Sequence, residues 1–262
     1  MSEPFKILIF SRTTAYRHES IPAGIRALQK LAASPTSKFT TDASEDPSLF
    51  TPSTLSQYRV IVLLQCSGDF LNDEQLAAFK GFVNNGGGVV GIHCTSFAML
   101  DEKEGWYARL IGAAFADHPE PQVGRVRVVD PLHPIIAGSL GKGSGMQRLK
   151  GGDAAEKGVT SACECEWEWT WRDEWYNFRE QPGTLRKVGE SSFHVLLVVD
   201  DKSFEGGKHG DDHPIAWCQE FVKGGRSFYT ALGHFDEAYE DEGFMAQVLG
   251  GIMWTAKAEG YR

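Results

Sequence analysis

Two apolar runs with a helical pattern between them constrain the fold most. The run Tyr58–Gln65 reads YRVIVLLQ, and the run Val89–Ile92 reads VVGI. Runs that are apolar at nearly every position are typical of parallel strands covered on both faces. Between them, Asn72 opens a segment with apolar residues at helical spacing, and Gly86–Gly88 ends it. A strand, a helix and a strand in this order predict a βαβ unit of a parallel sheet.

The pattern continues on both sides of this unit. Before it, the sequence predicts strands at Phe5–Phe10 and Phe39–Asp42, and a helix from Ser20 to about Ser34. The C-terminal half is richer in strands, which we expect at Val123–Val129, Trp167–Trp171, His194–Val199, Ile215–Trp217 and Arg226–Leu232, with a final helix over Glu242–Lys257. The segment Ala137–Ser161 is rich in Gly and Lys and is interpreted as a loop or family insertion.

These elements predict an α/β fold with a doubly wound, mostly parallel central sheet and a strand-rich C-terminal half. The chain has 262 residues, which is within the range of one α/β domain. We find no internal repeat and no strong linker, so we predict a single domain over residues 1–262.

Composition excludes several classes of partner. The net charge is −9, and no cluster of Lys and Arg opposes it, so we predict neither nucleic acid nor a membrane surface as partner. No apolar stretch approaches the ~20 residues that span a bilayer. Five cysteines at irregular spacing fit free thiols in a reducing compartment, which predicts a cytoplasmic protein.

Polar residues follow several of the predicted strands. His18 comes after the first strand, Gln65 after the third, His93 after the fourth and His234 after the late strand Arg226–Leu232. Open α/β sheets bind ligands at the carboxyl ends of their strands. We therefore expect these side chains to meet at one rim of the sheet.

His93 is the sharpest candidate among them. The sequence Gly91-Ile92-His93 turns from strand towards helix, which is how α/β enzymes expose a catalytic side chain. A satisfied structural histidine is the alternative. The neighbouring Cys94 points to another side of the chain, and we interpret it as a buried, inert thiol.

The histidines also raise a metal hypothesis. His18, His93, His118, His213 and His234 are numerous, but the sequence holds no HExxH motif and no paired CxxC motif. We predict no cofactor, and a divalent metal such as zinc is left open.

Acidic and aromatic residues alternate after the strand Trp167–Trp171. The segment Asp173–Phe178 reads DEWYNF, a mixture that suits acid–base chemistry beside a sugar-stacking wall. Packing of the aromatic residues into the core, with the acids in solvent, explains the pattern equally well.

Taken together, these features resemble the ThuA-like family, named for trehalose utilisation. The resemblance covers nearly the whole chain and is carried, in order, by Arg17–Ser20, Gly86–Ser96, Trp106–Gly112, Asp117–Pro119, Leu132–Ile135, Asp173–Tyr176, Pro214–Trp217 and Gly225–His234. It implies a flavodoxin-like sheet, similar to that of class I glutamine amidotransferases. Those enzymes carry a catalytic cysteine at the elbow where this sequence has His93, with Cys94 one residue late.

The resemblance also implies a role in carbohydrate metabolism, with a disaccharide or keto-glycoside as the small-molecule partner. On that basis we predict an enzyme with histidine acid–base chemistry, in which the catalytic residues are His93, His118, Glu174 and His234. The predicted substrate-binding residues are Arg17, His18, Trp175, Tyr176, Trp217 and Tyr229. A non-catalytic sugar-binding or regulatory protein and a metal-dependent hydrolase are the alternatives, and a homo-oligomer is left open.

Overall fold

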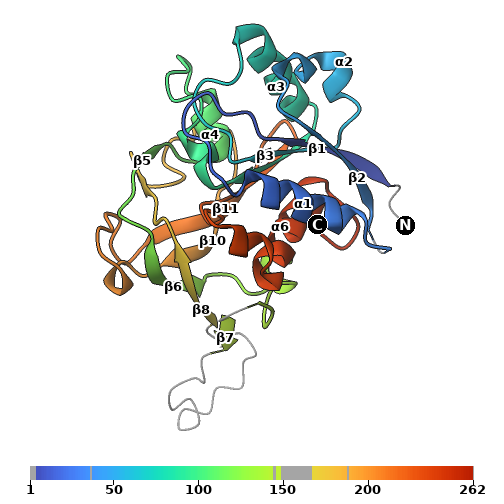
Figure 1. Cartoon of the computed structure of the whole chain (residues 1–262). Coiled ribbons are helices and arrows are strands. Elements are labelled where there is room, and N and C mark those ends of the chain that lie inside the picture. The colour runs from blue at the N-terminus through green and yellow to red at the C-terminus, as the bar shows by residue number, and fades with distance from the viewer. Residues whose placement is uncertain (1–3, 36, 144–145, 149–166, 188, 262) are drawn as a thin grey trace.

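A ten-stranded sheet runs through the molecule (Figure 1). The computed structural model describes residues 4–35, 37–143, 146–148, 167–187 and 189–261. The strands of this sheet are β1 (Phe5–Phe10), β2 (Phe39–Ser44), β3 (Val60–Leu64), β4 (Gly88–Ile92), β6 (Gln122–Val128), β7 (Met146–Arg148), β8 (Trp167–Asp173), β10 (His194–Val199), β11 (His213–Glu220) and β12 (Arg226–Thr230). A separate two-stranded sheet pairs β5 (Phe115–Asp117) with β9 (Asn177–Phe178).

The large sheet is parallel in one half and antiparallel in the other. Its order is β2-β1-β3-β4-β12-β11-β10-β6-β8-β7. The first five strands run parallel, and every later pairing is antiparallel. The predicted mostly parallel sheet is therefore correct only for the first half. Parallel neighbours need a long crossover connection, whereas antiparallel neighbours do not, and the strand-rich half of the chain uses few helices.

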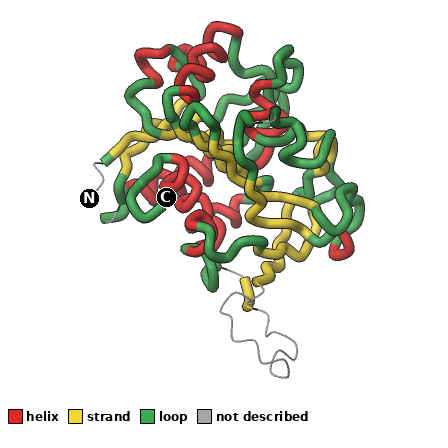
Figure 2. The backbone as a smooth tube through the Cα atoms, turned by 180° about the vertical axis from the view of Figure 1, so that it is seen from behind, coloured by secondary structure: helices red, strands yellow, loops and turns green. Residues whose placement is uncertain are grey.

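Helices cover both faces of the parallel half (Figures 1 and 2). The two on one face are α1 (Ile21–Ala32) and α6 (Glu242–Thr255). The opposite face carries α2 (Pro52–Leu55), α3 (Asp73–Asn84) and α4 (Trp106–Ile111), and a short α5 (Pro134–Ala137) packs against α6. Within the described ranges, no helix has the length and apolar character needed to cross a membrane.

Burial explains why the parallel strands form at these positions. All five residues of β3, of β4 and of β12 are buried, as the continuous apolar runs predict. The helix between β3 and β4 begins with a capping box, in which the Asn72 side chain accepts from the Gln75 backbone and the Gln75 side chain accepts from the Asn72 backbone.

Most predicted elements lie within a few residues of the observed ones. The main difference falls in Ala137–Ser161, interpreted above as a loop, where β7 pairs with β8. The sequence missed β7 because a three-residue edge strand has no periodicity to read. Residues 149–161 of that segment lie outside the described residues, and the single domain over residues 1–262 stays a prediction.

Candidate functional site

Four side chains bring their ligand-type atoms together at the carboxyl ends of the parallel strands. His18, His93, His234 and Glu174 each offer one nitrogen or oxygen, and these atoms all lie within 4.8 Å of one another. We call these four residues the donor cluster. The three histidines follow β1, β4 and β12, and the parallel register places those strand ends on one side of the sheet. Glu174 comes from the antiparallel half, directly after β8.

His93 sits on an unusual backbone. Its φ is 55°, in the left-handed region that non-glycine residues rarely adopt, at a cost of about 1–3 kcal/mol. The hydroxyl of Tyr229 donates to the His93 carbonyl oxygen at 2.7 Å, which holds this conformation. The ring nitrogen Nδ1 lies 2.7 Å from the carbonyl oxygen of Ala231. Because a carbonyl only accepts, Nδ1 carries the proton and Nε2 presents a lone pair to the cluster.

His18 is oriented in a similar way. The Cys94 thiol donates to the Gln65 carbonyl oxygen, so its sulfur accepts from His18 Nδ1, which lies 3.4 Å away. The Nε2 atom of His18 then presents its lone pair 3.1 Å from Nε2 of His93. Two lone pairs at this distance repel each other unless a proton or a metal cation lies between them.

Glu174 completes the cluster with one carboxylate oxygen. Its Oε2 atom lies 3.3 Å from His93 Nε2, 3.2 Å from His234 Nδ1 and 3.9 Å from His18 Nε2. Burial by itself raises the pKa of Glu174, but the imidazole rings of His18, His234 and His93 around the carboxylate outweigh it and hold this pKa far below its usual range. Burial lowers the pKa of His18 to about 4. Near neutral pH the cluster thus holds an ionised carboxylate beside a neutral His18.

The spacing of these atoms fits a bound cation. Donors about 2.0–2.1 Å from a tetrahedral zinc ion lie about 3.3–3.4 Å from one another. Four of the donor separations, including the 3.3 Å between His93 Nε2 and His234 Nδ1, fall between 3.1 and 3.3 Å, and that between His18 Nε2 and Glu174 Oε2 is 3.9 Å. Imidazole nitrogens with one carboxylate are a common ligand set for divalent transition metals.

Asp173 positions two members of the cluster. This fully buried carboxylate accepts the backbone N–H groups of Glu174 and His234, and also those of Gly233 and the Trp171 indole. It therefore ties the end of β8 to the loop after β12. The sequence analysis did not single out Asp173, because its role depends on a contact with residues sixty positions away.

Gln65 also holds the loop after β12, through hydrogen bonds of its side chain. Its side-chain amide donates to the Gly233 carbonyl oxygen at 2.6 Å and to the Tyr239 hydroxyl at 3.0 Å. Gln65 also has a positive φ of 53°, so the ends of both β3 and β4 turn through left-handed residues. Its position at a strand end was the only sequence signal for this role.

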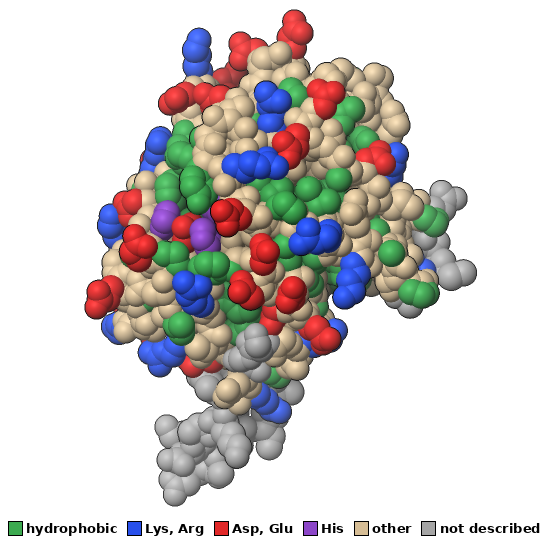
Figure 3. Space-filling model, in the orientation of Figure 1, with side chains coloured by type: hydrophobic (Ala, Val, Ile, Leu, Met, Phe, Trp, Pro, Cys, Tyr) green, Lys and Arg blue, Asp and Glu red, His purple; other side chains and the backbone are tan. Residues whose placement is uncertain are grey.

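His118 and Tyr176 lie beside the donor cluster. His118 Nε2 is 3.6 Å from the second carboxylate oxygen of Glu174, and its side chain is 33% exposed. The Tyr176 hydroxyl lies 2.9 Å from His93 Nε2, and burial raises the pKa of this phenol well above its usual range. Figure 3 shows histidine side chains on one face of the molecule with an acidic side chain between them.

The other predicted substrate-binding residues lie elsewhere. Arg17 is on the surface and pairs with Glu45 at 2.7 Å. The indoles of Trp175 and Trp217 are buried and donate to backbone carbonyl oxygens. Tyr229 is buried beneath the His93 backbone. Of the residues predicted to bind substrate, His18 and Tyr176 are those that the structure brings to the donor cluster.

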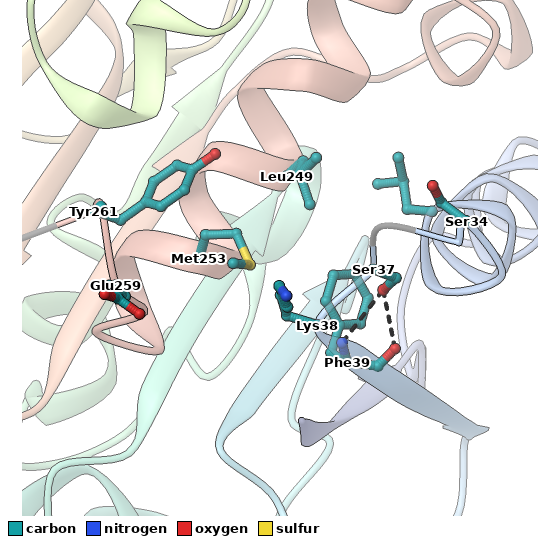
Figure 4. Close-up of a pocket in the computed structure, with 10 residues that line it drawn as sticks. Ser34, Ser37, Lys38, Phe39, Leu249, Met253, Glu259 and Tyr261 are labelled. Atoms are coloured by element: carbon teal, nitrogen blue, oxygen red, sulfur yellow. Dashed lines mark hydrogen bonds between the residues drawn. The ribbon is translucent and has the colours of Figure 1, made fainter. Parts of the chain in front are cut away.

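A pocket of about 490 Å³ lies beside the start of β2 (Figure 4). It is lined by residues from the start of β2 and from α6, among them Phe39, Leu249 and Met253. Phe39 begins its strand, so this pocket is at the amino ends of the parallel strands. Sheets of this kind bind ligands at the carboxyl ends, where the donor cluster lies.

Comparison with known families adds an independent observation. The family model for ThuA, described as trehalose utilisation, matches residues 6–142 and 153–255. The chain belongs to the ThuA family. A search of curated proteins finds no match for this ThuA chain.

Solved structures agree with the family assignment. A ThuA-like protein from Bacteroides uniformis has a TM-score of 0.68 at 21% identity, covering 97% of this chain and 93% of that protein. A second, from Parabacteroides merdae, has a TM-score of 0.67 at 21% identity, covering 97% of this ThuA chain and 90% of its own. A cytoplasmic protein from Salmonella typhimurium has a TM-score of 0.52 at 12% identity, covering 96% and 99%. At these identities the likeness shows a shared fold.

Proposed function

We propose that this ThuA chain is a metal-dependent enzyme of carbohydrate metabolism that acts on a keto-glycoside or a related oxidised sugar. The donor cluster is the observation that carries the proposal. Three histidines and one carboxylate from four separate strand ends converge with the spacing of a divalent metal site.

A metal explains the cluster better than a network of proton transfers. The ring nitrogens His18 Nε2 and His93 Nε2 both present lone pairs, since the other nitrogen of each ring has its own partner. The ionised Glu174 adds a negative charge beside them. A divalent cation removes these repulsions at once, and the Nδ1–H to carbonyl bond of His93 is the usual way in which a ligating histidine is oriented.

This arrangement changes the role that we assign to His93. Its side chain is fully buried and the lone pair of its Nε2 atom points at the cluster, so we assign it as a ligand. His118 is the better general base, because its ring is partly exposed and its Nδ1 lies 2.9 Å from the Pro119 carbonyl oxygen. That contact leaves the lone pair on Nε2 of His118, and the Glu174 carboxylate 3.6 Å away would stabilise the ring once Nε2 accepts a proton.

The chemistry that these groups support is proton abstraction next to a carbonyl. A divalent metal held by the donor cluster would supply a Lewis acid for a keto oxygen and so make the proton on the adjacent carbon more acidic. His118 is placed to take the proton released there. The family description, trehalose utilisation, supports a sugar as the source of the keto group.

Two finer assignments accompany this proposal. The parallel strand order β2-β1-β3-β4-β12 supports a flavodoxin-like, amidotransferase-like description of that half of the sheet. A cytoplasmic location is supported by the description of the Salmonella typhimurium protein as cytoplasmic.

The test combines metal analysis with turnover. Untagged protein is incubated with zinc, desalted and analysed by mass spectrometry, and turnover of 3-keto-disaccharides is measured before and after chelation. We expect about one equivalent of metal and activity that chelation abolishes and metal restores. His93→Asn and Glu174→Gln should each lower metal affinity by at least about 100-fold, since even residues behind the ligands change it by 10–100-fold. Asn suits the positive φ at position 93.

His194→Asn is the matched control. His194 also pairs with a carboxylate, that of Asp130 at 3.0 Å, but lies on the exposed end of β10. This variant should bind metal as the unaltered protein does. Protein that binds no metal and turns over keto-sugars unchanged in the presence of a chelator would refute the proposal.

A further inference from the structure

We propose that Tyr176 donates a hydrogen bond to the substrate oxygen held at the donor cluster, and so acts as a catalytic residue that stabilises negative charge on that oxygen. This inference rests on the proposed function and adds a role for a residue beyond the ligands.

The Tyr176 hydroxyl has a defined partner in the structure. It lies 2.9 Å from His93 Nε2. Since Nδ1 of His93 donates to the Ala231 carbonyl oxygen, Nε2 is the acceptor of the neutral ring, and Tyr176 is then the donor. The phenol therefore points its proton at the atom that a metal would use.

A metal ion on His93 Nε2 takes this lone pair away from Tyr176. Packing holds the Tyr176 ring and so the position of its hydroxyl oxygen, because the ring lies against His93 and Phe115 with centroids 4.6 Å away in each case. Its backbone is also fixed, since the Tyr176 carbonyl oxygen lies 2.8 Å from His213 Nε2. A buried donor left without an acceptor is unfavourable.

An oxygen bound to the metal is the acceptor that this geometry offers. The hydroxyl of Tyr176 is beside the cluster, so an exogenous oxygen that joined the four residues around the metal would lie within its reach. A carbonyl oxygen of a sugar gains negative charge when the adjacent carbon loses its proton. A fixed O–H group aimed at that oxygen binds the charged state more tightly than the ground state.

The experiment uses cobalt-loaded protein and acetohydroxamate as the probe, because this small oxyanion would bind the metal in addition to the four protein ligands and change the visible spectrum of cobalt. Tyr176→Phe removes the hydroxyl and keeps the ring. We expect one equivalent of cobalt in both proteins, and an acetohydroxamate Kd raised by about 10-fold or more in Tyr176→Phe. With keto-sugar substrate, kcat should fall by about 100-fold, with KM changed much less.

Tyr107→Phe is the matched control. Tyr107 is equally buried, but its hydroxyl donates to the Thr95 carbonyl oxygen at 3.1 Å and does not contact the donor cluster. This variant should keep the acetohydroxamate affinity of the unaltered protein.

The outcomes separate the two proposals. If the unaltered protein takes up no cobalt, the proposed function fails. If Tyr176→Phe binds cobalt and acetohydroxamate as the unaltered protein does, the role of Tyr176 fails while the metal site stands. If Tyr176→Phe loses cobalt, Tyr176 supports the metal itself, and the role proposed here is wrong.

Discussion

Because His93 has a positive φ, its side chain and that of the neighbouring Cys94 lie in different environments. The turn at the end of β4 directs the imidazole into the donor cluster. Cys94, one residue later, is 2% exposed and its thiol donates to the Gln65 carbonyl oxygen. Burial raises the pKa of this thiol far above its usual value, so the thiolate that nucleophilic catalysis needs does not form near neutral pH.

We therefore expect Cys94 to resist alkylation in the folded protein. Native protein is treated with iodoacetamide at neutral pH, digested, and analysed by peptide mass spectrometry. The Cys94 peptide should remain unmodified, and it should become modified when the protein is denatured first. Rapid labelling of Cys94 in the native protein would contradict this account and revive a cysteine mechanism.

At the scale of single residues, part of the site could be predicted from the sequence. The strand-end positions of His93 and His234 follow from apolar runs that end in a polar residue, a local signal. The roles of Trp175 and Trp217 could not be read in this way. An aromatic residue in a strand looks the same in sequence whether it lines a pocket or packs into the core, as both indoles do here.

At the scale of elements, α6 packs closely against its neighbours at two of its glycines, Gly250 and Gly251. A Cβ atom at Gly251 would lie within 2.1 Å of the Phe228 ring on β12, and one at Gly250 would lie 2.4 Å from the Ile135 carbonyl oxygen on α5. The helix can therefore lie directly against the strand whose end carries His234. This contact supports the cluster from the face of the sheet that α6 covers.

Gly251→Ala should destabilise the protein by about 1–3 kcal/mol, since the added methyl group collides with Phe228. Gly81→Ala is the matched control, because Gly81 lies in α3 with nothing within 4 Å of its Cβ position. That substitution should stabilise by about 0.5–1 kcal/mol. Denaturant unfolding measures both, and equal effects of the two variants would contradict the packing described for α6.

At the scale of the whole molecule, the donor cluster joins the two halves of the sheet. The three histidines follow strands of the parallel half, whereas Glu174 follows β8 near the antiparallel edge. The sequence analysis named Glu174 but could not place it. The order of β11, β10, β6 and β8 depends on pairings between segments far apart in the chain, and only the folded sheet brings β8 to the histidines.

A metal that binds this cluster should stabilise the folded state as a whole. At a free metal concentration of 100 times Kd we expect about 2.7 kcal/mol of added stability. Thermal unfolding with and without zinc measures this as a rise in Tm. Glu174→Gln should reduce the rise, because it removes the ligand that the antiparallel half supplies. A zinc-induced rise of the same size in that variant would show that zinc acts at another site.

The four N–H groups that converge on Asp173 have a consequence for how metal enters the protein. They keep the chain around Glu174 and His234 ordered whether or not an ion is present. Loading then needs no folding step and little loss of conformational entropy. Protein whose ion has been removed by a chelator should take the ion up again under native conditions. The rate of uptake should be bimolecular, with no slow conformational phase.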